Sequence, residues 1–240
     1  MSHQLADVTW TSVQGSPLVL VPVGSTEQHG PHLPLDTDTT IATAVAWAVA
    51  ERLAGDVLVA PALAYGSSGE HQDFAGTSSI GTDALAMFVI ELVRSMSAWA
   101  GRIVFVNGHG GNITALSRAL AQMVAEQHDV AWAPCATEYL DLHAGRTETS
   151  LMLHLRPGAV DLAHAEVGNT QSLKEIRPRL EQDGVAAVSP NGVLGDPSGA
   201  SAEEGEHLLH TMVDDVLQRV HAPRADLQGM LTIPVAEPSR

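Results

Sequence analysis

Residues Leu18 to Asp38 read LVLVPVGSTEQHGPHLPLDTD, and this segment indicates the architecture of the chain. Its opening run, LVLVPV, is apolar and rich in β-branched side chains, which is typical of a strand covered on both faces. A polar loop follows, and the segment from Thr39, TTIATAVAWAVAERLAG, has recurrent apolar positions and ends at Gly55. That pattern predicts a helix with a glycine at its C-terminal end. A buried strand, a polar loop and a helix in this order predict an α/β sheet.

The same order recurs along the chain. Expected strands cover 57–60, 103–106 and 130–133, and expected helices begin near Asp83 and cover 113–127, 148–155 and about 202–220. Strands separated by helices predict a mostly parallel sheet with right-handed crossovers and helices on both faces. The segment from Pro157 to Pro197 is expected to be irregular. We expect residues 1–222 to form a single domain and residues 223–240 to form a C-terminal tail.

The composition excludes two classes of partner. The 240 residues include 12 Lys and Arg against 28 Asp and Glu, so the formal net charge is −16. Nucleic acid and membrane surfaces bind clusters of cationic side chains, so we expect neither as a partner.

Cys135 is the only cysteine, which makes an intrachain disulfide impossible and favours a cytoplasmic location. No apolar stretch approaches the roughly 20 residues that span a bilayer.

The loop after the first expected strand carries a candidate set of metal ligands. Glu27 and His29 lie two residues apart, so their side chains share one face of an extended segment, and Asp38 can fold back toward them. Carboxylate and imidazole groups together bind Zn²⁺, Fe²⁺ or Mn²⁺. The alternative is a polar turn in which Asp36 or Asp38 caps the following helix. The loop alone leaves both interpretations open.

A glycine-rich loop, NGHGGN at 107–112, follows the expected strand at 103–106. It places His109 at the carboxyl end of a strand, which is the edge where ligands bind in open α/β sheets. The glycines allow backbone, metal or substrate to approach closely. A glycine loop that opens a helix can also bind phosphate, but the dinucleotide and P-loop patterns are both missing from the sequence. We therefore favour metal.

A third polar cluster, LHAGRTETS at 142–150, places His143 and Glu148 around a glycine turn that enters a helix. Glu148 is a candidate ligand and His143 a candidate proton carrier. The alternative is a glutamate favoured by the helix dipole beside a loop histidine. Three such clusters at strand-to-helix junctions converge on one crevice, which favours the metal interpretation. Glu70 and His71, in the long loop 64–82, are predicted to contact substrate rather than metal.

Together these segments resemble the creatininase family. The sequence contains GSTEQHGPHLPLDTD, GEHQDFAGT, NGHGGN, HAGRTETS and GDPSGASAEEG in the family's order, over roughly residues 5 to 220. The resemblance implies a three-layer α/β/α sandwich and an amidohydrolase that holds two adjacent divalent ions, Zn²⁺ or Fe²⁺, with Mn²⁺ as a further candidate. It also implies a symmetric homo-oligomer, either a hexamer or an octamer.

The resemblance assigns roles to individual residues. Glu27 and His109 would bind one ion, His29 would bind the other, and Asp38 would bridge them. Creatininase has a tyrosine and a glutamate after the histidine of the NGHGGN loop, and that glutamate is a ligand. This chain has two glycines, at 110 and 111, in their place. Glu148 is therefore our substitute ligand for the second ion.

The resemblance also implies a mechanism. Two divalent ions lower the pKa of a water molecule and polarise the scissile carbonyl, so no protein nucleophile is required. Asp38 and Glu148 would hold the ions, and His143 would donate a proton to the leaving nitrogen. The substrate would contact Glu70, His71, Gly110 and Gly111.

The double glycine and HAGRTETS are similar to the family members that act on a modified precursor peptide. This implies a peptidase that releases a C-terminal dipeptide derived from Val-Tyr. The alternative substrate within the family is a cyclic amide or a formamide metabolite. A phosphate-binding protein and a structural subunit are the alternatives from other functional classes.

Overall fold

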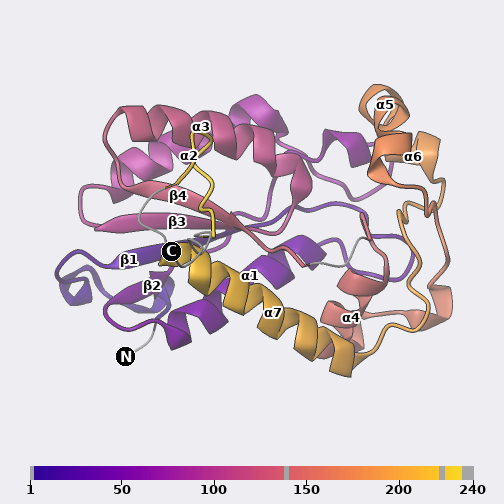
Figure 1. The fold of residues 1–240 in the computed structure, drawn as a ribbon, viewed down its shortest axis with the longest axis horizontal. Coiled ribbons are helices and arrows are strands. Elements are labelled where there is room, and N and C mark those ends of the chain that lie inside the picture. The colour runs from indigo at the N-terminus through magenta and orange to yellow at the C-terminus, as the bar shows by residue number, and fades with distance from the viewer. Residues whose placement is uncertain (1–2, 138–140, 222–224, 234–240) are drawn as a thin grey trace, which may run out of the picture.

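Four parallel strands form the sheet of the computed structural model, which describes residues 3–137, 141–221 and 225–233 (Figure 1). The strands are β1 (Leu18–Val23), β2 (Val57–Val59), β3 (Arg102–Asn107) and β4 (Val130–Pro134), in the spatial order β2-β1-β3-β4. Leu18 pairs with Val57 on one side and with Arg102 on the other, and Ile103 pairs with Val130. The predicted parallel sheet is confirmed.

The pleat of the strands divides the apolar core into two layers. Val19 and Phe105 face a cluster that includes α2 (Gly81–Met96) and α3 (Ile113–Ala125). Leu20 and Val104 point the other way, into a cluster that includes side chains of three other helices: α1 (Thr37–Arg52), α4 (Arg146–Leu155) and α7 (Ala202–Val220). Figure 1 shows α2 and α3 on one side of the sheet, and α1 and α7 on the other. The three-layer α/β/α sandwich is therefore confirmed.

Two helices lie in the segment that was expected to be irregular. They are α5 (Leu173–Asp183) and α6 (Val185–Val188), and both lie at the same end of the molecule as α4 (Figure 1). A capping box starts α5, in which Glu175 Oε2 accepts a 2.9 Å hydrogen bond from Ser172 N. Gly184, with φ of 76°, separates the two helices. A single turn of 3₁₀ helix occurs at Leu5–Asp7, Trp10–Ser12, Gly69–His71, Gly110–Asn112, Pro157–Ala159 and Leu162–His164.

Part of the segment predicted as a C-terminal tail packs on β4. Trp132 N donates a 2.8 Å hydrogen bond to Gly229 O, and Leu231 N donates one of 2.8 Å to Trp132 O. Leu231 is fully buried. Residues 223–224 and 234–240 of the predicted tail lie outside the described residues. Within the described residues, no helix combines the length and the apolar character needed to cross a membrane.

Candidate active site

The loops at the carboxyl end of the sheet bring the predicted ligands together. Glu27 and His29 follow β1, and His109 follows β3. His109 Nε2 lies 3.2 Å from Glu27 Oε2, and His109 Nδ1 lies 3.2 Å from Asp38 Oδ2. His29 Nε2 lies 3.0 Å from Asp38 Oδ1. All four side chains are buried, so they form one enclosed cluster of carboxylates and imidazoles.

Asp38 reaches this cluster because the first turn of α1 packs against the strand ends. A Cβ at Gly108 would lie 2.7 Å from Asp38 O, and a Cβ at Gly24 would collide with the backbone of the same turn. Glycine at both positions therefore lets the helix begin beside β1 and β3. Asp36 occupies the N-cap position without a side-chain cap hydrogen bond, and Asp38 faces the histidines. Asp36 therefore holds the predicted N-cap position, but its side chain does not cap the helix through a hydrogen bond.

A second group of candidate ligands lies next to His29. Its Nε2 is 3.8 Å from Glu148 Oε2, and the ring centroids of His29 and His143 are 4.3 Å apart. Glu148 lies in the first turn of α4, where its Oε2 accepts a 2.6 Å hydrogen bond from Ala144 N. Ala144 has φ of 52°, in the left-handed region. This tight turn brings His143 and Glu148 to the cluster formed by the loops after β1 and β3.

His71, which was predicted to contact substrate, lies against Glu27. Its Nε2 is 3.3 Å from Glu27 Oε1, and its Nδ1 is 2.9 Å from Gln28 Nε2. Because an amide nitrogen donates, His71 Nδ1 accepts, and the Nε2–H faces the Glu27 carboxylate. The structure therefore places buried His71 in contact with a candidate ligand. Its contact with substrate stays a prediction.

Gln28 is a site residue that the sequence motifs did not single out. Its amide nitrogen contacts His71 and also donates a 3.0 Å hydrogen bond to Gly192 O. Its backbone oxygen accepts a 2.7 Å hydrogen bond from His143 Nε2. Gln28 thus orients two histidines of the site. Its place between two candidate ligands in the chain is the signal that points to it.

Asn112 joins the three loops that carry the site. Its Oδ1 accepts a 2.9 Å hydrogen bond from Ser67 N in the loop after β2, and its Nδ2 donates one of 3.0 Å to Gly24 O after β1.

The phosphate-binding alternative for the NGHGGN loop finds no support in the contacts of His109. His109 faces two carboxylates, and these would repel a phosphate.

The buried carboxylates contain unsatisfied oxygens. Glu27 Oε1, Glu27 Oε2 and Asp38 Oδ2 have no hydrogen-bond partner among the described residues. Histidine nitrogens lie 3.2–3.3 Å from these oxygens without forming hydrogen bonds to them, and coordination to a cation would satisfy their free lone pairs. Three groups offer ligand atoms within 4.8 Å of one another: Glu27, Asp38 and His109; His29, His143 and Glu148; and Glu27, His71 and His143. The donor set therefore fits divalent cations.

Charge interactions shift the pKa values of the inner cluster. Burial alone would lower the pKa of His29, but Asp38 outweighs it and raises that pKa to about 10. The pKa of His109 lies well above its usual value, because Glu27 and Asp38 outweigh burial there too. Burial would raise the pKa of Asp38, but the two histidines hold it well below its usual range. In the metal-free protein both imidazoles are therefore protonated at neutral pH.

His143 shows the opposite shift. Burial lowers its pKa well below the usual value, and His29 and His71 lower it further. Burial also lowers the pKa of His71 to about 4 and raises that of Glu148 to about 7. His143 is therefore neutral at pH 7. Its Nε2–H is used by Gln28 O, so Nδ1 is left as a proton acceptor.

Gly110 and Gly111 differ in their surroundings. A Cβ at Gly110 would meet no atom within 4 Å, so this residue faces open space. A Cβ at Gly111 would collide with Ser67 O and His109 Nε2, and would lie 2.6 Å from Glu70 Oε1. Glu70 Oε1 is itself 3.6 Å from His109 Nε2, and burial raises the pKa of Glu70. The space beside Gly111 is therefore already occupied by the Glu70 carboxyl group.

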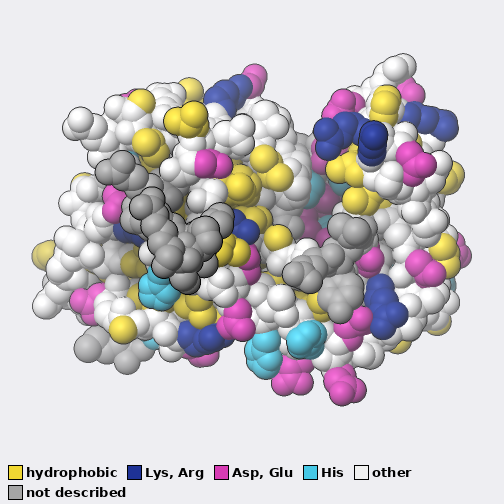
Figure 2. Space-filling view, in the orientation of Figure 1, with side chains coloured by type: hydrophobic (Ala, Val, Ile, Leu, Met, Phe, Trp, Pro, Cys, Tyr) yellow, Lys and Arg dark blue, Asp and Glu magenta, His cyan; other side chains and the backbone are white. Residues whose placement is uncertain are grey.

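A cleft of ≈ 990 Å³ opens onto these residues. The predicted site residues that line it are Asp38, Glu70, His71, His109, Gly110, Gly111, His143 and Glu148. Its lining also includes Leu173, Arg177, Leu180 and Glu181 of α5. Figure 2 shows this hollow with acidic and histidine side chains at its base. Glu27 and His29 do not line the cleft and are fully buried.

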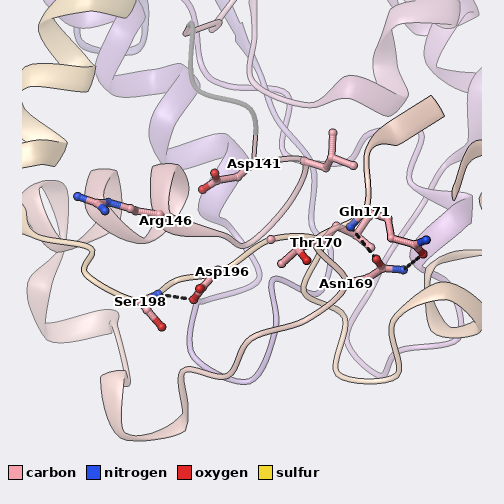
Figure 3. A pocket seen from close by; sticks show the side chains of 10 residues that line it. Asp141, Arg146, Asn169, Thr170, Gln171, Asp196 and Ser198 are labelled. Atoms are coloured by element: carbon pink, nitrogen blue, oxygen red, sulfur yellow. Dashed lines mark hydrogen bonds between the residues drawn. The ribbon is translucent and has the colours of Figure 1, made fainter. Parts of the chain in front are cut away.

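A smaller cavity of ≈ 350 Å³ shares Leu142 and Leu194 with the large cleft. Its polar lining comes from segments 141–146, 169–171 and 196–198 (Figure 3). Two of its carboxylates accept backbone hydrogen bonds, from Thr147 N to Asp141 Oδ2 at 2.6 Å and from Ser198 N to Asp196 Oδ1 at 2.9 Å. None of the predicted site residues lines it. The large cleft is therefore the candidate active site.

Comparison with known proteins gives a consistent set of similarities. The creatininase family model, described as creatinine amidohydrolase, matches residues 6–220. The chain is 54% identical over 225 residues to the mycofactocin precursor peptide peptidase of Mycobacterium tuberculosis, which covers 90% of each chain. Among solved structures, it is similar to a mutant creatininase of the Zn-Zn type and to creatininase Mn. Each has a TM-score of 0.73 at 26% identity and covers 90% of this chain and 96% of the other.

Proposed function

The chain belongs to the creatininase family, and we propose that its activity is the hydrolysis of a peptide. It hydrolyses an amide bond as a peptidase of mycofactocin biosynthesis, and it releases a C-terminal dipeptide derived from Val-Tyr from the precursor peptide. The likeness to the Mycobacterium tuberculosis peptidase over 90% of the chain carries this proposal. A cyclic amide or a formamide is not favoured, because the chain is 54% identical to the precursor peptide peptidase and only 29% identical to the creatinine amidohydrolase of Pseudomonas putida.

The proposed enzyme holds two divalent ions, Zn²⁺ or Fe²⁺, with Mn²⁺ as a further candidate. Glu27, Asp38 and His109 would hold one ion. His29, Asp38 and Glu148 would hold the other, and Asp38 would bridge the two sites. The unsatisfied oxygens of Glu27 and Asp38 support this assignment, because they are the buried atoms that most need a cation.

The chemistry then follows from the chain's own groups. The ions, when bound, supply a nucleophile at neutral pH and polarise the scissile carbonyl. His143 Nδ1 accepts the proton that the attacking water loses, because Gln28 O holds the Nε2–H and the low pKa keeps the ring neutral. His143 then donates that proton to the leaving nitrogen. His71 packs against the Glu27 carboxylate, with its Nε2 3.3 Å from Glu27 Oε1, and limits the movement of that side chain.

The substrate contacts and the assembly are further parts of the proposal. Glu70, His71 and the two glycines at 110 and 111 contact the peptide, and the open space at Gly110 gives its backbone room to pass. A cytoplasmic location agrees with the single cysteine. A homo-oligomer, either a hexamer or an octamer, is supported by exposed apolar side chains such as Met87 and Phe88 on α2. Light scattering of the purified protein measures its size.

Mass spectrometry of the reaction products tests this function. Protein purified without oxygen is mixed with the modified precursor peptide, before and after metal is removed by a chelator and restored. We expect release of the C-terminal dipeptide by the loaded protein, loss of cleavage on chelation and recovery on reloading. Cleavage at the same rate by metal-free protein, or an intact peptide with fully loaded protein, contradicts the proposal.

A further inference from the structure

Among the described residues, the cationic side chains of α5 differ from the other arginines in having no ion pair. Seven arginines outside this helix each take part in an ion pair: Arg52, Arg94, Arg102, Arg118, Arg146, Arg156 and Arg219. Lys174, Arg177 and Arg179 all lie on α5, and in the described residues none of them has an ion pair or a side-chain hydrogen bond. In a chain with a net charge of −16, three exposed cations without an ion pair to any described residue are thus gathered on one short helix.

Arg177 is the member of this cluster that belongs to the cleft. It lines the same cavity as Asp38, His109 and Glu148, and the described lining contains no other Lys or Arg. Figure 2 shows Lys and Arg side chains beside the hollow, at the place where Figure 1 shows α5. Arg177 therefore lines the same cleft as three of the candidate metal ligands.

The other charged side chains of the described cleft lining, apart from the histidines, are acidic, so Arg177 is the group there best suited to pair with an anion. Besides the proposed ligands, the lining carries Glu70, Asp73, Glu181 and Asp183. Two divalent ions would neutralise the ligands, but these outer carboxylates would still repel an anionic group of the substrate. Glu181 lies four residues after Arg177 on α5 and yet forms no ion pair with it, so the guanidinium is available.

We propose that Arg177 binds the C-terminal carboxylate of the peptide substrate. A guanidinium and a carboxylate form two parallel hydrogen bonds, which fix orientation as well as position. The peptide would then lie with its C-terminal end toward α5 and its scissile bond over the metal ligands. A dipeptide spans about 7 Å, so its terminal carboxylate stays within the same cleft as the scissile bond. This inference rests on the proposed function and names the group that sets which end of the peptide is cut.

The test compares two forms of one substrate, with a free C-terminal carboxylate and with a C-terminal amide. Cleavage of both is measured for the wild-type protein, Arg177→Ala, Arg177→Lys and the control Arg179→Ala. Arg179 carries the same charge on the same helix but does not line the cleft. Metal content and thermal unfolding are measured for every variant, which separates a binding effect from a folding effect.

The wild-type protein is expected to prefer the free carboxylate by about 10- to 100-fold in kcat/KM, since a charge-assisted pair of hydrogen bonds is replaced by a neutral contact. Arg177→Ala should lose most of this preference, mainly through KM, with unchanged metal content. Arg177→Lys should keep part of it, and Arg179→Ala should keep all of it. The preference in the wild-type protein should also weaken at high salt.

Two different results would contradict these proposals, and the experiment distinguishes them. If Arg177→Ala cleaves the precursor peptide with the same preference for the carboxylate as the wild-type protein, Arg177 does not bind that group and the inference is overturned alone. If the loaded wild-type protein cleaves neither form, the proposed function fails and the inference fails with it.

Discussion

Among single residues, the two neighbouring glycines of the NGHGGN loop offer a sharp comparison. A methyl group at Gly110 would enter open space, whereas one at Gly111 would collide with Ser67 O and His109 Nε2. We predict that Gly110→Ala keeps the metal content and the melting temperature of the wild-type protein. Gly111→Ala should lose metal and about 1–3 kcal/mol of stability, because the neighbouring atoms must shift. Equal behaviour of the two variants in elemental analysis and calorimetry would contradict this packing.

His29 makes metal binding depend on pH. In the metal-free protein its pKa is raised to about 10, because Asp38 stabilises the protonated ring, but a metal ligand must be neutral. Each binding event near pH 7 should therefore release at least one proton, and the apparent affinity should rise between pH 6 and pH 8. Calorimetric titrations in two buffers of different ionisation enthalpy measure the released protons. Binding without proton release would show that His29 is already neutral.

The candidate ligands were predictable from the sequence because each lies where a strand gives way to a helix. Glu27, His29, His109 and Glu148 occupy such positions, and the parallel sheet brings them to one edge. Gln28 was not predictable in the same way. Its role depends on contacts with residues far along the chain, and a glutamine between two ligands carries no motif of its own.

Among the secondary-structure elements, α5 contributes several residues to the lining of the cleft. Its capping box joins Ser172 and Glu175 at the exposed start of the helix. We predict that Ser172→Ala weakens the helix by about 1 kcal/mol and speeds hydrogen exchange of the α5 amides. Metal content should stay unchanged, because α5 holds no candidate ligand. A matched control is Ser95→Ala, on the exposed face of α2, for which the exchange of α5 should not change.

The same helix shows where the sequence pattern was insufficient. The strand at 18–23 and the helix at 202–220 were predicted with their observed bounds, because long apolar patterns define them. In α5, Pro178 lies inside the helix, where proline is unfavourable, and Ile176 is the single buried residue, so the sequence signal for a helix is weak. The Ser172–Glu175 spacing was the available signal. The contribution of α5 to the cleft lining therefore became visible only in the structure.

For the whole molecule, the distribution of charge matters more than its sum. The net charge of −16 is the reason for expecting neither nucleic acid nor a membrane surface as a partner, but it does not describe the site. Buried Glu27 and Asp38 concentrate negative charge at the end of the sheet, and the unpaired cations of α5 stand beside the same cleft. This arrangement suits divalent cations at the base of the cleft and an anionic peptide end at its rim.

A metal titration of the metal-free protein, with bound metal and cleavage of the precursor peptide measured in the same samples, decides whether the buried carboxylates act through two ions. We predict that cleavage rises until two ions are bound per chain and then remains constant. The variant Glu27→Gln should bind fewer ions and lose cleavage by at least about 100-fold, because a neutral amide is a poor substitute for a ligand carboxylate. Glu91→Gln, a change at the surface of α2, should match the wild-type protein. Full cleavage without bound metal, or a fully loaded and active Glu27→Gln variant, would contradict the two-ion site.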